Sequence, residues 1–269
     1  MLSVFVNWRW RNLLLALGLL TGLWTGFIFV AQENWPLFPP VDSSLWWVHF
    51  LPLLALFAAV KSKSPPLRMG TNFFMTLCSG IYLYLLTTPI RTYEWSTLYA
   101  MGFCGVVALG MGLLPVIYVR TLPALAPASA WPLTILIAGS GSAYLFLVGS
   151  SAKLQQYALF LVLLQILPLL IFLWKASDTE REHYPSVFGL FSSWFLLHLW
   201  VNSLLFSSLS GWGVLTVLAL LSPLMTRLNF IKHRGAVAKL CAVGLCALLC
   251  TALGIGAVLL TQTQAEIYY

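Results

Sequence analysis

The sequence predicts an all-α integral membrane protein, a polytopic bundle of about nine transmembrane helices, and three observations support this. The chain is 60% hydrophobic, only 8% charged and has a mean hydropathy of +0.91, whereas roughly a quarter of the residues in soluble domains are charged. The lengths of its apolar blocks are close to the length of about 20 residues that a helix needs to cross a bilayer core. They show no alternation with a period of two, which argues against a membrane barrel.

The predicted spans follow one another along a single transmembrane domain, residues 1–269, with short polar connections. The first apolar run, about 19 residues long, exceeds the core of a signal peptide, so it is expected to remain as a span. The second and eighth spans are short and contain Pro52 and Pro223; if both were re-entrant, the number of crossings would be seven. The expected spans are residues 12–31, 45–60, 69–89, 95–119, 131–150, 157–174, 187–206, 211–228 and 240–261.

The basic residues orient this bundle. Twelve of the fourteen Lys and Arg residues fall in alternate connections, on one side of the predicted zigzag. By the positive-inside rule this side is cytoplasmic, so the N-terminus is expected in the cytoplasm and the C-terminus outside. The opposite side carries two cations, Arg91 and Lys153. The cytoplasmic set is Arg9, Arg11, Lys61, Lys63, Arg68, Arg120, Lys175, Arg181, Arg227, Lys232, Arg234 and Lys239.

Composition and motifs also exclude several classes of function. The connections are about a dozen residues or shorter, too short for a core of their own. No phosphate-binding P-loop, dinucleotide fingerprint or H-E-x-x-H motif is present. The net charge of +7 is scattered over short loops, which indicates membrane orientation rather than nucleic-acid binding.

Neutral polar residues inside the spans are the candidates for ligand binding. No Asp, Glu, Lys or Arg lies deep within any predicted span, although such residues are the usual markers of intramembrane function. His49, Gln165, His198 and Asn202 remain. His198 and Asn202 are four residues apart, so they share a helix face. Together with Gln165 they form the polar site expected of the first alternative function, a small-solute or lipid transporter.

A second alternative is a redox subunit that binds haem or a quinone. His49 and His198 lie at similar predicted depths, separated by about 6 Å along the membrane normal, and two imidazoles on different spans are able to ligate a haem b axially. They are equally able to hydrogen-bond a quinone or another helix. The structural role of a simple hydrogen bond is favoured, so no cofactor and no metal site is predicted.

Catalysis would need a different site, at the membrane surface. Glu33 and Asp42 in the first outer connection and Glu94 in the second are the outer-loop acidic candidates for a general base. They form no paired-acid motif, and the residues around the first two are rich in proline. The sequence therefore favours a protein without enzymatic activity.

Small residues within the spans predict close helix packing. Glycine lets two helix backbones approach one another in a membrane, and it occurs repeatedly in the fourth, fifth and ninth spans. The helix-packing candidates are Gly102, Gly105, Gly139, Gly141 and Gly254.

These patterns together favour a non-catalytic multi-pass subunit or scaffold of a larger membrane assembly. Its partners would be the lipid bilayer and other membrane subunits, with no nucleic acid, and its location the bacterial cytoplasmic membrane. Its mechanism would be packing: small-residue faces seat neighbouring helices, and short basic loops contact partners or anionic lipid.

Overall fold

Every regular element in the described part of the chain is a helix, so the all-α prediction is confirmed there. The computed structural model describes residues 65–121, 129–149, 151–174, 178–206 and 211–267, with isolated positions between 17 and 50. The chain divides into two compact units, Met1–Ile117 and Tyr118–Tyr269. The predicted spans at 12–31 and 45–60 lie mostly outside the described residues.

The first unit contains a helical hairpin made by α3 (Pro65–Leu86), α4 (Thr88–Tyr93) and most of α5 (Thr97–Thr121), whose last turn belongs to the second unit. Prolines open α3 and α4, where a missing backbone N–H leaves no helical hydrogen bond unmade. The expected span at 69–89 differs from the structure at its end, because the α-helix stops at Leu86 and a short second helix follows Thr87.

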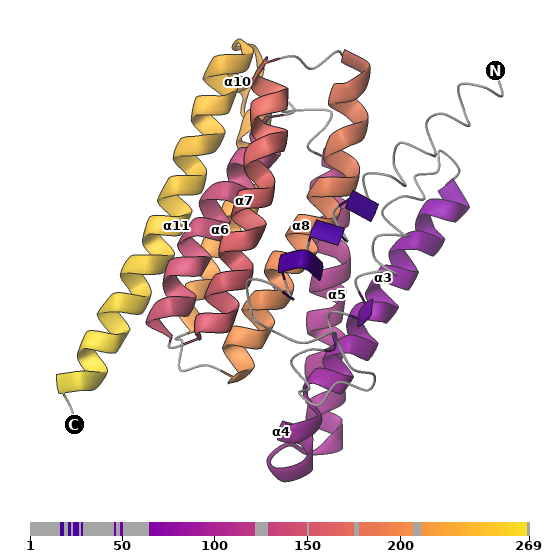
Figure 1. Ribbon diagram of the computed structural model, residues 1–269, viewed down its shortest axis with the longest axis vertical. Helices are drawn as coiled ribbons and strands as arrows, with labels where there is room; N and C mark the ends of the chain where they lie inside the picture. Colours follow the sequence, from indigo (N-terminus) through magenta and orange to yellow (C-terminus); the bar gives the residue numbers. More distant parts are fainter. Residues whose placement is uncertain are drawn as a thin grey trace. The chain divides into compact units, whose positions relative to one another are not determined.

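Small side chains let α3 and α5 pack closely in antiparallel directions. A Cβ on Gly112 would collide with Thr76, and a Cβ on Gly80 would lie 3.6 Å from that of Ala108. Nearer the turn, Thr87 Oγ1 lies 3.6 Å from Cys104 Sγ. Along these contacts the residue numbers on α5 decrease as those on α3 increase, so the two helices are antiparallel (Figure 1).

The second unit is a bundle in which long helices run side by side (Figure 1). Large buried aromatic side chains, among them Trp131, Phe146, Trp194 and Trp200, fill its core. Its elements are α6 (Ala130–Val148), α7 (Ala152–Trp174), α8 (Asp178–Phe206), the 3₁₀-helix η3 (Gly211–Val214), α9 (Leu215–Leu218), the 3₁₀-helix η4 (Ala219–Arg227), α10 (Asn229–Lys232) and α11 (Ala236–Ile267).

Contacts between helices show that the chain reverses direction at each step through this unit. The turn at Gly149, whose N–H bonds to the carbonyl of Leu145 at 2.8 Å, reverses the chain between α6 and α7. The side chain of Gln165 on α7 reaches Ser192 on α8, so these helices are neighbours, and Figure 1 shows them running in opposite directions. On α6, Leu133 lies beside Gly244 of α11, and Gly141 lies beside Thr251. The numbers of the contacting residues increase in the same direction on both helices, so α6 and α11 run in parallel.

The segment predicted as the eighth span, 211–228, is largely a 3₁₀-helix rather than an α-helix. Nine consecutive residues of η4 have this form, although runs longer than three or four are uncommon. Side chains on a 3₁₀-helix repeat every three residues, and burial follows that period. Within η4, Ala219 and Ser222 are buried, whereas Leu221 and Leu224 are half-buried and Arg227, on the same face as these two, is exposed.

Two of the described helices are long and apolar enough to cross a membrane, Ala130–Val148 and the stretch Ala236–Thr261 of α11. Shorter apolar helices are Phe73–Leu86, Thr97–Leu113, Ala152–Ile166 and Gly211–Arg227. Two such helices hint at a membrane location, and the nine crossings within one transmembrane domain stay a prediction.

Candidate functional site

The candidate site is a row of buried polar residues on α8. Side chains from Ser192 to Val201 are almost completely shielded from solvent, and polar groups are interspersed among aromatic and aliphatic ones. Burial of a polar group is costly unless it is hydrogen-bonded, so the partner of each one decides what the row is able to do. The buried polar residues of α8 are Ser192, Ser193, His198, Asn202 and Ser203.

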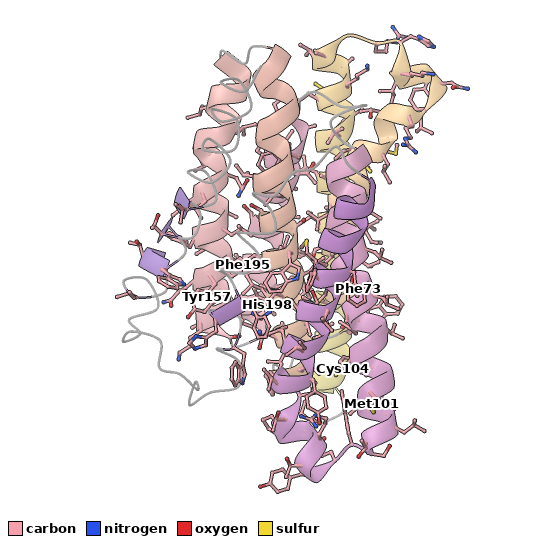
Figure 2. All side chains as sticks on the ribbon, turned by 90° about the vertical axis from the view of Figure 1, so that its right-hand side faces the viewer. Phe73, Met101, Cys104, Tyr157, Phe195 and His198 are labelled. Carbon is pink, nitrogen blue, oxygen red and sulfur yellow. The ribbon has the colours of Figure 1, made fainter. Side chains whose placement is uncertain are left out.

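His198 and Asn202 contact each other directly. The distance from Asn202 Nδ2 to His198 Nε2 is 3.1 Å, as their spacing of four residues on one helix allows. An amide nitrogen only donates, so with this amide orientation Nε2 is the acceptor and its lone pair is engaged. The ring is stacked on Trp194, with centroids 5.6 Å apart and planes at 5°. Phe195 lies beside it on the same helix (Figure 2).

A second hydrogen bond ties α8 to α6. The indole Nε1 of Trp200 donates to Ser142 Oγ at 2.8 Å, and both side chains are buried. The same hydroxyl donates to the carbonyl of Ala138 at 2.7 Å. The Ser142 hydroxyl therefore donates a hydrogen bond within α6 and accepts one from Trp200 on α8. The second bond satisfies the buried indole N–H.

Gln165, on α7, contacts a different face of α8 from the face that carries His198. Its Nε2 donates to Ser192 Oγ at 3.0 Å, while its buried Oε1 has no hydrogen-bond partner among the described residues. Ser192 lies six residues before His198, which places the two about 120° apart around the helix. The predicted trio thus separates into one contacting pair, His198 with Asn202, and Gln165 with a serine.

His49 lies in the first unit and His198 in the second. The ring of His49 makes an edge-to-face contact with Trp46, with centroids 6.0 Å apart. A haem iron takes an unprotonated ring nitrogen with a free lone pair, and at His198 Nε2 that lone pair faces the Asn202 amide. The haem-binding alternative at His49 and His198 stays a prediction.

Of the three acidic candidates, the structure describes one. Glu94 is exposed and ends α4, with its backbone N–H bonded to the carbonyl of Ile90 at 2.8 Å. Glu33 and Asp42 lie outside the described residues. Glu94 therefore occupies the tight connection that leads from α4 into α5.

The predicted packing glycines fall into two groups. A Cβ on Gly139 would lie 2.8 Å from a methyl group of Val162, and one on Gly141 would collide with Thr251. A Cβ on Gly254 would lie 2.9 Å from the backbone nitrogen of Thr216. Gly102 and Gly105 on α5 differ from these, because a Cβ on either would meet nothing within 4 Å.

One polar arrangement was not predicted from the sequence. The guanidinium of Arg91 lies over the ring of Tyr84, 3.5 Å from its centroid, and Nη2 donates to the Tyr84 carbonyl at 2.8 Å and to Thr88 Oγ1 at 3.0 Å. It thereby binds a carbonyl in the last turn of α3, as basic side chains often do at helix ends. The sequence signal is an isolated arginine seven residues after a tyrosine, just past a helix break.

Comparison with protein-family models, with curated proteins and with solved structures finds no match for this chain.

Proposed function

We propose that this chain is a multi-pass integral protein of the bacterial cytoplasmic membrane that serves as a non-catalytic subunit or scaffold of a membrane assembly. The observation that carries the membrane part is the number of large apolar side chains on the surface of the helices, which is more than a soluble protein exposes. Large apolar residues are exposed along the helices, and hydroxyl, amide and imidazole groups are buried between them.

Helix α11 supports the proposal most directly. Only 28% of the residues in its most apolar stretch are buried. The exposed leucines are spaced three, one, four and seven residues apart, which places them on one face of the helix. This face is too large and too apolar to be left in water. Hydrocarbon chains of lipid are its natural solvent. The face consists of Leu245, Leu248, Leu249, Leu253 and Leu260, each more than half exposed.

The buried hydroxyls fit the same environment. Thr134 Oγ1 donates to the Ala130 carbonyl at 2.7 Å, and Thr226 Oγ1 donates to the Pro223 carbonyl at 2.7 Å. Ser79 bonds to the carbonyl of Met75 in the first unit in the same way. Donation to a carbonyl of the same helix satisfies a hydroxyl without water, which is the requirement for polar groups inside a bilayer.

The 3₁₀ geometry also gives the eighth segment enough length to cross. At about 2.0 Å per residue in η3 and η4 and about 1.5 Å in α9, Gly211–Arg227 extends about 32 Å. The same residues as an α-helix would extend about 26 Å, less than the about 30 Å of a hydrocarbon core. A full crossing is therefore favoured over the re-entrant alternative, and the alternating helix directions of the second unit agree with it.

Site-specific labelling tests the membrane orientation. We expect a cysteine at position 234, introduced into a cysteine-free chain, to react with an impermeant maleimide only after spheroplasts are permeabilised. A cysteine at position 153 is expected to react in intact spheroplasts, because Lys153 follows the turn between α6 and α7 on the opposite side. Both positions are exposed, so access to reagent depends on the side of the membrane. Labelling of both from one side would contradict the proposed topology.

The subunit role is supported by the open glycines of α5. Gly102 and Gly105 lie on an exposed face beside Leu98, Met101 and Val106, which are each more than half exposed. Small residues on an apolar helix face allow another transmembrane helix to approach closely. The contacts of Gln165 and His198 favour this role over the transporter alternative, because they do not join into one polar surface.

The mass of the protein in mild detergent tests the subunit role. We expect the wild-type chain, extracted from native membranes, to elute with a mass above that of one copy. Gly102→Leu and Gly105→Leu are each expected to reduce it to the mass of one copy, because their side chains fill the space that a neighbouring helix would use. Gly70→Leu on α3 is the matched control, since a Cβ there also meets nothing within 4 Å. A monomeric wild-type protein, or equal effects of all three variants, would count against an assembly through α5.

A further inference from the structure

A compact cationic turn connects η4 to α11 in the second unit. Four basic residues occur between positions 227 and 239, a stretch that contains α10 and no acidic residue. None of the four pairs with a carboxylate in the described part of the chain. We call residues 227–239 the basic turn, and its cations are Arg227, Lys232, Arg234 and Lys239.

Backbone hydrogen bonds give the basic turn a fixed shape. The N–H of Lys232 bonds to the Leu228 carbonyl at 2.8 Å, and that of Arg234 bonds to the Ile231 carbonyl at 2.9 Å. The side chain of Ile231 is buried and anchors α10 against its neighbours, whereas Arg227, Lys232 and Arg234 are exposed. The cations therefore project from an ordered backbone rather than from a loose tail, so little backbone entropy is lost when they bind.

Apolar side chains are exposed among these cations. Phe230 is 69% exposed and Val237 is 77% exposed, and each lies within three residues of a basic side chain. Water does not favour exposed apolar side chains. The boundary between lipid headgroups and acyl chains accommodates both cationic and apolar side chains. In Figure 2 nitrogen-bearing side chains project from the light orange end of the ribbon that contains α10. The opposite end of the unit has Lys153 as its described cation.

We propose that the basic turn binds the phosphate headgroups of anionic phospholipids in the cytoplasmic leaflet, an inference that rests on the proposed membrane function. The four cations balance the negative charge of the headgroups, and each is able to donate hydrogen bonds to phosphate oxygens. Phe230 and Val237 enter the acyl-chain boundary and keep the cations at headgroup depth. The site selects the charge of the lipid and leaves its chain length free.

A lipid titration followed by native mass spectrometry tests the site. The full-length protein in detergent is titrated with phosphatidylglycerol or with phosphatidylcholine, and the dissociation constant of the first bound lipid is measured. We expect phosphatidylglycerol to bind at least tenfold more tightly. The double variant Lys232→Gln with Arg234→Gln is expected to lose most of this preference, at about fivefold for each cation removed. Added salt is expected to weaken the preference further.

Two control variants separate charge from shape and position. The variant Lys232→Arg with Arg234→Lys retains both charges and is expected to retain the preference, and Lys153→Gln at the other end is expected to leave it unchanged. Equal binding of the two lipids by the wild type, or an undiminished preference in the neutral double variant, would overturn the proposal. Failure of the membrane proposal gives a different result, because it is detected by the cysteine labelling and not by lipid charge.

Discussion

Replacing Trp200 with alanine is expected to lower the free energy of unfolding by about 3 kcal/mol, the largest effect of any single substitution considered. The indole is 2% exposed and packs against Phe146, with ring centroids 5.1 Å apart. Removal of a large buried ring leaves a cavity whose lining loses its contacts. In a membrane the cost comes mainly from lost packing, since lipid also solvates the unfolded helix.

The hydrogen bond of Trp200 is separable from its packing by a double-mutant cycle. Trp200→Phe removes the N–H and keeps most of the ring volume, whereas Ser142→Ala removes the acceptor. We expect a coupling free energy of about 1 kcal/mol between the two substitutions, measured by unfolding in mixed micelles of dodecyl maltoside and dodecyl sulfate. Thr226→Val is the control, because that hydroxyl bonds only within its own segment and its loss is expected to cost little. Additive effects of Trp200→Phe and Ser142→Ala would show that the bond contributes nothing.

The second large effect is expected at the crossing of α11 with α9. Gly254→Ala would place a Cβ 2.7 Å from Thr216 Cγ2 and 2.9 Å from the Thr216 backbone nitrogen. A side chain is able to move aside, but a backbone atom in a packed segment is not, so we expect a loss of about 1–3 kcal/mol in the free energy of unfolding. The measurement is the same unfolding titration.

The control for this substitution lies two residues away. A Cβ on Gly256 meets nothing within 4 Å, so Gly256→Ala is expected to be neutral or stabilising by up to about 1 kcal/mol, since alanine favours helix. Thr216→Ser is expected to restore only part of the stability of Gly254→Ala, because it removes the methyl contact and leaves the backbone contact. Equal stabilities of Gly254→Ala and Gly256→Ala would contradict the close approach of α9.

Hydropathy predicted the positions of two long apolar helices but not the form of the eighth segment. The expected span 131–150 corresponds to Ala130–Val148, and the span 240–261 lies within α11. The span 211–228 also matches in position, yet most of it is a 3₁₀-helix. The mean hydropathy of a segment indicates how many of its residues avoid water. It contains no information on the helical rise per residue. The three-residue recurrence of large side chains at Leu218, Leu221 and Leu224 was the available signal.

The candidate site shows the same division between local and distant contacts. The pairing of His198 with Asn202 was predictable because a spacing of four residues fixes their relative position on one helix. The bond from Gln165 to Ser192 joins residues 27 positions apart and depends on how α7 and α8 rotate against each other. The helices are apolar on most faces, so the pattern of the sequence contains little information about that rotation.

The 3₁₀ geometry of η4 restricts how the length of this segment is able to change during evolution. Deleting one residue from Ala219–Arg227 rotates every later side chain by about 120°, which exchanges the outward-facing leucines with inward-facing small residues. A three-residue insertion preserves all faces and lengthens the segment by about 6 Å, which a membrane helix accommodates by tilting at modest cost. Length variants of this protein are therefore expected to differ here by multiples of three, in contrast to the α-helices on either side.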